Sequence, residues 1–488
     1  MKLSARQLIE LVLDEDSWQS WDTPPSYGEI GAAYAADLAK ARERSGVDES
    51  VLTGEGLMRG RRVAVVLGEF SFLAGSIGRA SARRLVAGIE RATTEGIPLL
   101  AAPISGGTRM QEGTPAFVEM VSISAAVARH KSAGLPYLVY LRNPTTGGVM
   151  ASWGSLGHIT VAEPGALVGF LGPRVYEALY GEAFPEGVQT SENLYAHGII
   201  DAVVPADQIA DILDRALGIL LARPGVPGEE ANESARAEVE TWDAVIRSRR
   251  TDRPGVRRLL KYGATDVIPL NGTGEGETDP GLLIALARFG DSPCVFLGQD
   301  RREQSSQPMG PGALREARRG MRLAVELGLP LLTVIDTPGA ALSAAAEEGG
   351  MAGEIARCLA DLVTLRAPTL CLMLGEGNGG GALALLPADR IIAAQHAWLS
   401  PLPPEGASAI VYRDTDHAPE MARAQKVRAQ DLQALGVVDR IIPEHPDAAD
   451  EPEAFCARVG GALEVELAGL INADVDVLLE RRANRFGG

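Results

Sequence analysis

Apolar runs and segments with helical spacing alternate along most of the chain. Residues 62–67, 135–141 and 329–335 are predicted to be short strands because each is a brief, nearly continuous apolar run. Helical spacing marks residues 4–13 and 34–44 near the N-terminus, and the tail after residue 443 also predicts helices. Alternating strands and helices are typical of an α/β fold, so we expect that class here.

Glycine pairs follow two apolar runs in the first half of the chain. Gly106-Gly107 precedes Thr108, and Gly147-Gly148 precedes Val149, each at the expected start of a helix. Glycine lets the backbone turn with positive φ and lets a ligand approach the main chain closely. Amide groups at a helix start have no internal partner and favour negative charge. The pattern therefore predicts either ordinary turns or an oxyanion hole made of backbone amides.

A second copy of this arrangement favours the oxyanion hole. Pro338-Gly339 matches the first pair and Gly380-Gly381 matches the second, in the same order and at the same spacing to within one residue. The two halves also end alike, at residues 198–205 and 436–443. We infer one fold, duplicated, with two amide-lined sites.

The length and a Pro/Gly-rich stretch place the boundary between the two copies. A chain of 488 residues is too long for one hydrophobic core. Residues 223–230 predict a linker, because their prolines and glycines end the preceding helix. We therefore expect one domain over residues 1–225 and a second over residues 226–488.

The composition excludes several classes of protein. A formal net charge of -18 argues against a nucleic-acid surface, and 9 Phe, 9 Tyr and 5 Trp are few for base-stacking platforms. The four cysteines form no CxxC pair, so we expect no zinc ribbon and no metal. We see no signal peptide and no uncharged apolar run of membrane-spanning length, so a cytoplasmic protein without a membrane segment is expected.

Some charged and titratable residues leave alternatives open. Six arginines fall within residues 242–262, which Pro254 is predicted to split into two short helices. They predict either a solvated helix face or a contact with phosphate or a partner. Glu112, Glu376 and His158 lie near the glycine turns, where a structural role and an acid–base role both stay open.

Familiar side-chain chemistry is absent from the sequence. It contains no GxSxG elbow, no P-loop and no HExxH motif. The site is therefore expected to consist mainly of backbone amides. Such a site suits a reaction through an enolate, because preorganised N–H donors stabilise charge that develops on oxygen.

At these residues the chain resembles the carboxyltransferase of biotin-dependent acyl-CoA carboxylases. The first half is similar to the bacterial acetyl-CoA carboxylase beta subunit, and the second half is similar to the alpha subunit. The matching segments are residues 69–78, 105–112, 143–148, 162–174, 335–339, 375–384 and 400–408. The two subunits are fused and the zinc ribbon of the beta subunit is missing, two features that resemble propionyl-CoA-type carboxyltransferases.

The resemblance implies two tandem crotonase-like (ClpP/crotonase) domains. The N-terminal domain would bind acyl-CoA, and the C-terminal domain would bind carboxybiotin on a separate carrier protein. The catalytic backbone groups, which hold the thioester enolate oxygen and the ureido oxygen of biotin, would be those of Gly147, Gly148, Gly380, Gly381 and Ala382. The remaining acyl-CoA site would comprise Gly75, Gly106, Gly107, Arg109 and Gly172. The remaining carboxybiotin site would comprise Pro338, Gly339, Glu405 and Gly406.

The resemblance also implies a reaction and partners. The enzyme would transfer a carboxyl group from carboxybiotin to a short-chain acyl-CoA, first acetyl-CoA, giving malonyl-CoA for fatty acid biosynthesis. The alternatives within the family are propionyl-CoA as the acceptor, or a carboxyltransferase-type component of a biotin-dependent decarboxylase. The partners would be biotin carboxylase and biotin carboxyl carrier protein. A homo-oligomer, a dimer or a multiple of dimers, is expected because the family joins the N-domain of one protomer to the C-domain of another.

Two further hypotheses come from other classes. A crotonase-type hydratase or isomerase usually needs a carboxylate at the reacting carbon and only one copy of the fold, so the duplicated site disfavours it. A non-catalytic scaffold is disfavoured by the intact glycine turns in both halves.

Overall fold

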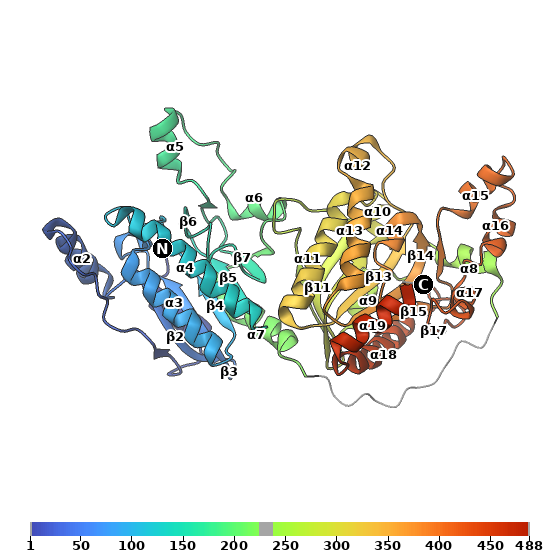
Figure 1. The fold of residues 1–488 in the computed structure, drawn as a ribbon, viewed down its shortest axis with the longest axis horizontal. Helices are drawn as coiled ribbons and strands as arrows, with labels where there is room; N and C mark the ends of the chain where they lie inside the picture. Colours follow the sequence, from blue (N-terminus) through green and yellow to red (C-terminus); the bar gives the residue numbers. More distant parts are fainter. Residues whose placement is uncertain (1, 224–237, 487–488) are drawn as a thin grey trace. The chain divides into compact units, whose positions relative to one another are not determined.

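Two mixed β-sheets with helices packed against them build the described part of the chain (Figure 1). The structure is a computed structural model, and it describes residues 2–223 and 238–486. The predicted domain boundary at residues 225 and 226 lies outside these described residues, as does nearly all of the predicted linker. The chain divides into unit 1, Met1–Leu217 with Gly274–Gly276, and unit 2, Gly218–Thr273 with Glu277–Gly488.

The sheet of unit 1 is antiparallel at one edge and parallel in the rest. Its strands, in spatial order, are β1 (Gln19–Ser20), β2 (Val51–Met58), β3 (Arg61–Gly68), β4 (Leu99–Ala102), β5 (Tyr137–Leu141), β7 (Ile159–Ala162) and β9 (Ala202–Val203). All pairs from β3 onward are parallel. Two short strands, β6 (Thr145–Thr146) and β8 (Val168–Gly169), form a separate parallel pair. Because parallel strands end at one edge of a sheet, the turns after β4 and β5 meet there.

Helices α3 and α4 lie side by side against the sheet of unit 1 (Figure 1). The core between them contains Val66, Leu85, Ile89, Ile123 and Val139, all buried. The helices of unit 1 are α1 (Ala5–Val12), α2 (Ala32–Ser45), α3 (Arg79–Thr94), α4 (Gly113–Ser132), α5 (Pro173–Tyr180), α6 (Ser191–Ala196) and α7 (Ile209–Leu220), with 3-10 turns η1 (Leu73–Gly75) and η2 (Ala206–Gln208). The two helices predicted at residues 4–13 and 34–44 are therefore confirmed as α1 and α2.

Unit 2 repeats this plan. Its sheet runs β10 (Asp266–Leu270), β11 (Leu282–Phe289), β12 (Ser292–Gln299), β13 (Leu331–Thr337), β14 (Thr369–Asn378), β15 (Arg390–Ala394) and β17 (Arg440–Ile442), with β16 (Trp398–Ser400) paired to β14. The pairs are antiparallel up to β12 and parallel beyond it.

The helices of unit 2 confirm two expectations. They are α8 (Thr241–Ser248), α9 (Val256–Gly263), α10 (Arg301–Gln304), α11 (Pro311–Leu327), α12 (Ala344–Glu348), α13 (Met351–Thr364), α14 (Gly379–Leu383), α15 (Pro404–Val411), α16 (Ala418–Ala424), α17 (Ala429–Ala434), α18 (Pro452–Ile471) and α19 (Val475–Phe486). Pro254 lies between α8 and α9, as predicted, and the tail is helical. Among the described helices, none has both the length and the apolar composition that crossing a bilayer requires.

Corresponding hydrogen bonds shape the turns after β4 and β13. The Ser105 hydroxyl oxygen accepts from the Gly107 amide at 3.0 Å, and the Thr337 hydroxyl oxygen accepts from the Gly339 amide at 3.1 Å. Gly107 and Gly339 both have positive φ, 109° and 125°. The duplication predicted from the sequence is thus repeated in individual bonds and backbone angles.

Backbone angles also fix the register of the second repeated turn. Gly147 has a φ of 66° and Gly379 has a φ of 67°, whereas Gly380 and Gly381 are not in the left-handed region. Gly379 therefore corresponds to Gly147, and Gly380 to Gly148. The predicted match of Gly380-Gly381 with Gly147-Gly148 is wrong by one residue, because three consecutive glycines give the sequence no landmark.

Helices α9 and α18 pack backbone against backbone. A Cβ added to Gly460 in α18 would lie 2.4 Å from the carbonyl oxygen of Gly263 and 2.7 Å from its Cα. A Cβ added to Gly263 would lie 2.6 Å from the Cys456 carbonyl oxygen. Only glycine fits at this crossing, which holds α9, and the loop before it, against the C-terminal helices.

We expect Gly460→Ala to lower the free energy of unfolding by about 2 kcal/mol, because the added Cβ forces the two backbones apart. The matched control is Gly461→Ala on the same helix, where an added Cβ meets nothing within 4 Å. Alanine should stabilise the helix there by up to about 1 kcal/mol. Urea denaturation followed by circular dichroism measures both variants, and equal stabilities would contradict the backbone contact.

Candidate functional site

In unit 1 the turns after β4 and β5 approach one another through glycine. A Cβ added to Gly107 would lie 3.6 Å from the Thr146 carbonyl oxygen and 3.7 Å from Gly147 Cα. A Cβ added to Gly147 would lie 3.3 Å from Gly107 Cα. The structure therefore brings together the two turns that carry the Gly106-Gly107 and Gly147-Gly148 pairs, with main chain facing main chain.

The corresponding turns of unit 2 also meet. A Cβ added to Gly339 would lie 3.8 Å from the Asn378 carbonyl oxygen. One added to Gly381 would lie 3.2 Å from the Ala340 amide nitrogen. Pro338-Gly339 thus contacts Asn378, directly before the glycine run that opens α14, and the predicted Ala382 is buried within that helix.

Main-chain donors remain at both meeting points. The Gly147 amide donates to the carbonyl oxygens of Phe170 at 2.9 Å and Gly169 at 3.2 Å. The Gly148 amide donates to no acceptor in the part of the chain that the structure describes. In unit 2 the first amides of α14 have no acceptor within their own helix, because they precede its first turn. Negative charge on a ligand oxygen would be stabilised at either place.

Gly75 supports the unit 1 turn from behind. It has positive φ, and a Cβ there would lie 2.1 Å from the Ile104 carbonyl oxygen. The neighbouring Ala74 carbonyl accepts from the Gly106 amide at 2.9 Å. These contacts favour a positioning role for Gly75 within the acyl-CoA site predicted from the resemblance. Gly172, also predicted there, is the N-cap of α5, and its ligand contact stays a prediction.

Arg109 lies buried beneath the same turn. Its side chain is 0% exposed and pairs with the equally buried Glu49. Its Nη2 donates to the Ser76 carbonyl oxygen at 2.7 Å, and its Nη1 donates to the Tyr34 hydroxyl at 3.1 Å. Burial alone would raise the pKa of Glu49, but the hydrogen bonds from Arg109 hold that pKa below its usual range. The contacts favour a positioning role for Arg109 and not the predicted contact with acyl-CoA, which needs an accessible guanidinium.

Asn378 is a site residue that the sequence reasoning missed. It is 3% exposed and immediately precedes the glycine run of α14. Its Nδ2 donates to the Pro338 carbonyl oxygen at 2.7 Å, which fixes the orientation of the amide. Its Oδ1 is buried and accepts no hydrogen bond within the described residues. An unsatisfied buried acceptor of this kind needs a partner, and a ligand donor is one candidate.

Glu405 and Glu376 share one arginine. Arg249 Nη1 donates to Glu405 Oε1 at 2.6 Å, and its Nε donates to Glu376 Oε1 at 3.2 Å. Burial raises the pKa of Glu376. Burial acts the same way on Glu405, but the hydrogen bond from Arg249 keeps the pKa of Glu405 below its usual range. The predicted contact of Glu405 and Gly406 with carboxybiotin stays a prediction.

Glu112 and His158 have structural partners. Glu112 Oε2 accepts from the Arg79 amide at 2.7 Å, and its Oε1 accepts from the Tyr34 hydroxyl at 2.5 Å. His158 Nδ1 accepts from the Tyr137 amide at 3.0 Å, and burial lowers the pKa of His158 well below its usual value. The Glu112 carboxylate is engaged by two donors, and His158 is a neutral acceptor. Both residues therefore fit the structural alternative.

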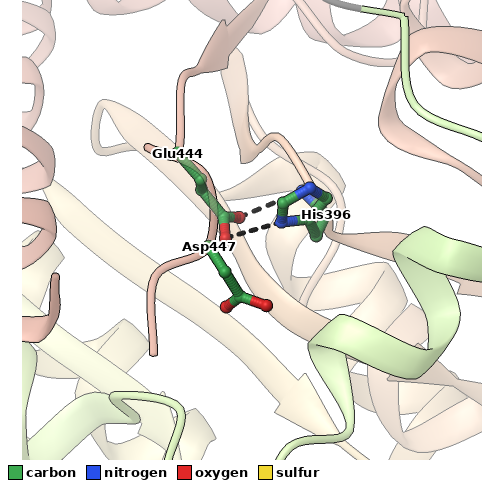
Figure 2. Close-up of side chains that lie close together, drawn as sticks. All are labelled: His396, Glu444 and Asp447. Atoms are coloured by element: carbon green, nitrogen blue, oxygen red, sulfur yellow. Dashed lines mark hydrogen bonds and ion pairs between the residues drawn. The ribbon is translucent and has the colours of Figure 1, made fainter. Parts of the chain in front are cut away.

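His396, Glu444 and Asp447 lie close enough together to raise the question of a metal centre (Figure 2). The Glu444 carboxylate lies 2.7 Å from His396 Nδ1 and accepts from Arg253 Nη1 at 2.7 Å and Nη2 at 2.8 Å. Burial would raise the pKa of Glu444, yet the Arg253 charge holds it far below its usual range. Arg253 therefore already supplies the positive charge that a metal ion would bring. The geometry of these four residues therefore favours a buried structural ion pair over a metal site.

An apolar cavity, which the sequence reasoning also missed, adjoins the unit 1 turn. Its volume is about 640 Å³, and its wall includes Met150, Ala151, Val168, Phe170, Phe184 and Leu194. Met150 and Ala151 follow the glycine pair in the chain, and the Phe170 carbonyl accepts from the Gly147 amide. The cavity and the turn therefore share part of one wall.

Known proteins match the chain over nearly its whole length. A family model described as the carboxyl transferase domain matches residues 2–474. The probable biotin-dependent acyl-coenzyme A carboxylase beta3 subunit of Mycobacterium tuberculosis (strain ATCC 25618 / H37Rv) is 58% identical over 486 residues, which cover 99% of this chain and 98% of that protein. The acetyl-coenzyme A carboxylase carboxyl transferase subunits beta/alpha of Salinispora arenicola (strain CNS-205) is 35% identical over 513 residues, covering 99% and 90%. The predicted resemblance is confirmed.

Solved structures share the fold. Transcarboxylase 12S, described as a hexamer assembly and solved with hydrolysed methylmalonyl-coenzyme A bound, has a TM-score of 0.74 at 22% identity, over 94% of this chain and 89% of that chain. A single-chain, multi-domain long-chain acyl-CoA carboxylase has a TM-score of 0.71 at 17% identity, over 93% and 45%. The predicted α/β class with two tandem crotonase-like domains is confirmed.

We expect Glu444→Gln to lower the free energy of unfolding by about 3–5 kcal/mol at pH 7, because it leaves Arg253 buried without its counter-charge. The pKa of Glu444 is lower in the folded protein than in the unfolded chain. Its contribution to stability is therefore fully present above the unfolded pKa of about 4.3 and is lost as the pH falls toward the folded pKa.

Urea denaturation from about pH 2 to about pH 7 measures this effect, since the loss is expected below the unfolded pKa. The control is Asp476→Asn, which removes a carboxylate from an exposed pair with Arg366 and should change stability little. A Glu444→Gln protein as stable as the wild type at pH 7 would contradict a stabilising role for the Arg253–Glu444 ion pair.

Proposed function

The chain belongs to the carboxyl transferase domain family, and on that premise we propose that it transfers a carboxyl group from carboxybiotin to a short-chain acyl-CoA, acetyl-CoA first. Its enzyme class is the carboxyltransferase of acyl-CoA carboxylases. The observation that carries the proposal is the repeated meeting of two glycine turns, once in each unit. Two amide-lined positions suit a reaction in which charge develops on two different oxygens.

In unit 1 the amide at Gly148 would hold the thioester oxygen of the acyl-CoA. Removal of an α-proton places negative charge on that oxygen, and a preorganised amide stabilises it without reorganising. Gly75, Arg109 and Glu49 would act indirectly, by fixing the Ser105–Gly107 turn against its neighbours. The carboxylate of Glu112 is occupied by Tyr34 and Arg79, which disfavours a hydratase that uses it as a base.

In unit 2 the groups at the turn fit the ureido group of biotin. A cyclic urea presents one carbonyl acceptor flanked by nitrogen, and an N–H donor remains when one nitrogen is carboxylated. The amide of Gly380 would donate to the carbonyl, and the buried Oδ1 of Asn378 would accept from the N–H. This pairing would satisfy the orphaned acceptor of Asn378. Carboxybiotin would supply the carboxyl group, carried on a separate protein that a biotin carboxylase loads.

The fused arrangement favours an oligomer of this chain. Each unit carries one of two oxygen-stabilising sites, so complete turnover needs one site of each kind to face the same reactants. We propose a homo-oligomer in which unit 1 of one protomer works with unit 2 of another, with malonyl-CoA as the product when acetyl-CoA is the acceptor.

A second candidate substrate is an acyl-CoA with a longer chain. The apolar cavity of about 640 Å³ beside the Gly147-Gly148 turn favours it, because an acetyl group needs far less apolar surface. Propionyl-CoA and longer acyl groups would gain from burial there, by roughly 0.8 kcal/mol for each buried methylene.

We expect Gly147→Ala to reduce carboxylation by about 10²-fold or more, because the added Cβ displaces the turn that places the Gly148 amide. Solvent exchange of the acyl α-protons should fall with it. Gly379→Ala, the equivalent change in unit 2, should instead reduce release of carbon dioxide from carboxybiotin and leave acyl-CoA binding intact. Steady-state rates, proton exchange by nuclear magnetic resonance and decarboxylation assays separate the two lesions.

Matched controls separate the effect of displacing the turns from the effect of backbone strain at positive φ. Gly134 and Gly328 also have positive φ, 72° and 63°, and an added Cβ meets nothing within 4 Å at either. Gly134→Ala and Gly328→Ala should lower stability by about 1 kcal/mol but keep wild-type turnover. If Gly147→Ala and Gly379→Ala fold and turn over like these controls, the glycines are ordinary turn residues.

We expect Ala151→Phe to fill the apolar cavity and to lower kcat/KM selectively for long acyl chains. The measurement is carboxylation of acetyl-, propionyl-, octanoyl- and palmitoyl-CoA with a carboxybiotin carrier. A loss of tenfold or more for the long chains, about 1.4 kcal/mol, with acetyl-CoA unaffected would place the chain in the cavity. A wild-type enzyme that uses only acetyl- and propionyl-CoA would assign the short-chain substrate instead.

A further inference from the structure

A cavity lined by arginine lies in unit 2, and Asp336, shortly before the Pro338-Gly339 turn, forms part of its wall. Its volume is about 390 Å³. The arginines in its wall are Arg250, Arg253, Arg257, Arg258, Arg301 and Arg302. The only carboxylates in that wall are Asp300 and Asp336. A cluster of this sign stands out in a chain whose net charge is -18, because it creates a local positive field.

Four of the arginines already have carboxylate partners, among them Arg301, whose Nη1 lies 3.7 Å from Asp336 Oδ1. Arg253 pairs with Glu444, Arg257 with Asp300, and Arg250 with Asp252 and Asp450. Within each pair the positive and negative charges neutralise each other. They hold the wall rigid and do not by themselves attract a ligand.

The other two arginines, Arg302 and Arg258, form no ion pair with a carboxylate within the described residues. Arg302 is exposed, and its guanidinium has no hydrogen bond or ion pair within the described residues. Within the described residues, the guanidinium of Arg258 donates only to the Asp252 carbonyl oxygen, at 3.1 Å. Arg301 donates to the carbonyl oxygens of Ser248 and Arg250, and its Nη1 lies 3.7 Å from Asp336 Oδ1. Arg301 is therefore held by protein groups, and the charges of Arg302 and Arg258 remain without a carboxylate partner within the described residues.

The start of α9 adds main-chain donors to the same wall. Gly255 is the N-cap of this helix and offers no side chain to accept from the first amides. Gly255, Val256 and Arg257 all line the cavity. Uncapped amides at a helix start favour an anion, and here they lie beside guanidinium groups.

A buried donor without a partner points to a ligand independently of the helix. The Arg253 side chain is 2% exposed and lines the cavity, and its Nε donates to no acceptor within the described residues. Such a group is expected to have a partner, and in a cationic cavity that partner is an acceptor with negative charge.

We propose that this cavity binds an oxyanion of the phosphate class. A tetrahedral oxyanion would accept from the guanidinium groups of Arg302 and Arg258 and from the first amides of α9. Planar guanidinium forks match phosphate oxygens in pairs, so arginine suits this ligand better than lysine would. Inorganic phosphate and the phosphate groups of CoA share this chemistry and are two sources of the same ligand.

Calorimetric titration of the full chain with inorganic phosphate at low ionic strength tests the proposal. We expect Arg302→Gln and Arg258→Gln each to weaken phosphate binding about tenfold, the loss of one charge-assisted contact. Arg366→Gln is the matched control, because it removes an exposed arginine of unit 2 outside the cavity. Circular dichroism confirms folding, which Arg302→Gln should not disturb because its guanidinium contacts no partner among the described residues.

Two results would overturn the proposal: a wild-type protein that binds no phosphate, or Arg302→Gln and Arg258→Gln proteins that bind it as tightly as Arg366→Gln does. Competition then identifies the source. Displacement of phosphate by CoA but not by 3′-dephospho-CoA assigns the cavity to the CoA 3′-phosphate. Absence of displacement by either assigns it to inorganic phosphate. The test needs no carboxyl transfer, so its outcome is independent of the proposed enzyme function.

Discussion

The site depends on main chain meeting main chain where two parallel strands end. Gly107 and Gly147 lie so close that a Cβ on the second would be 3.3 Å from the Cα of the first. A side chain at either position would separate the turns and move the amide that follows. Positive φ at both residues makes glycine necessary twice over, for space and for backbone angle. The buried ion pair of Arg109 with Glu49 then holds one turn in place from below.

Duplication preserved this frame and changed the groups around it. In unit 1 the residue before the glycine pair is Thr146, whose hydroxyl donates to the Ser105 carbonyl at 3.3 Å. In unit 2 the equivalent residue is Asn378, whose longer side chain reaches the Pro338 carbonyl and leaves Oδ1 without a donor. The side chain before the glycines is thus satisfied internally in unit 1, and in unit 2 it is not. Under the proposed function, this difference would let the same backbone serve a thioester at one site and a urea at the other.

The sequence predicted the architecture well because its landmarks are local. Apolar runs, glycine turns and Pro254 each act on their own neighbours, and the strands, the turns and the break at Pro254 appear where expected. The helix expected to start at Gly147-Gly148 is wrong, because residues 147–154 form turns and no helix. The register of the second turn was wrong because only the φ of Gly379 distinguishes three successive glycines. The burial of Arg109 could not be predicted either. A charged residue after a turn is ordinarily exposed, and its partner Glu49 lies sixty positions earlier in the chain.

The arginine-rich segment shows why a count of charges predicts so little. Its sequence allowed a solvated face or a phosphate contact, and most of its arginines do neither. Arg249 reaches Glu376, and Arg253 reaches Glu444, so the segment ties together strand ends that lie far apart in the chain. Each such pair removes a positive charge from the local field. The positive field that remains comes from the few guanidinium groups that, within the described residues, have only carbonyl oxygens as partners or no partner. An anion can bind to those groups without displacing a carboxylate.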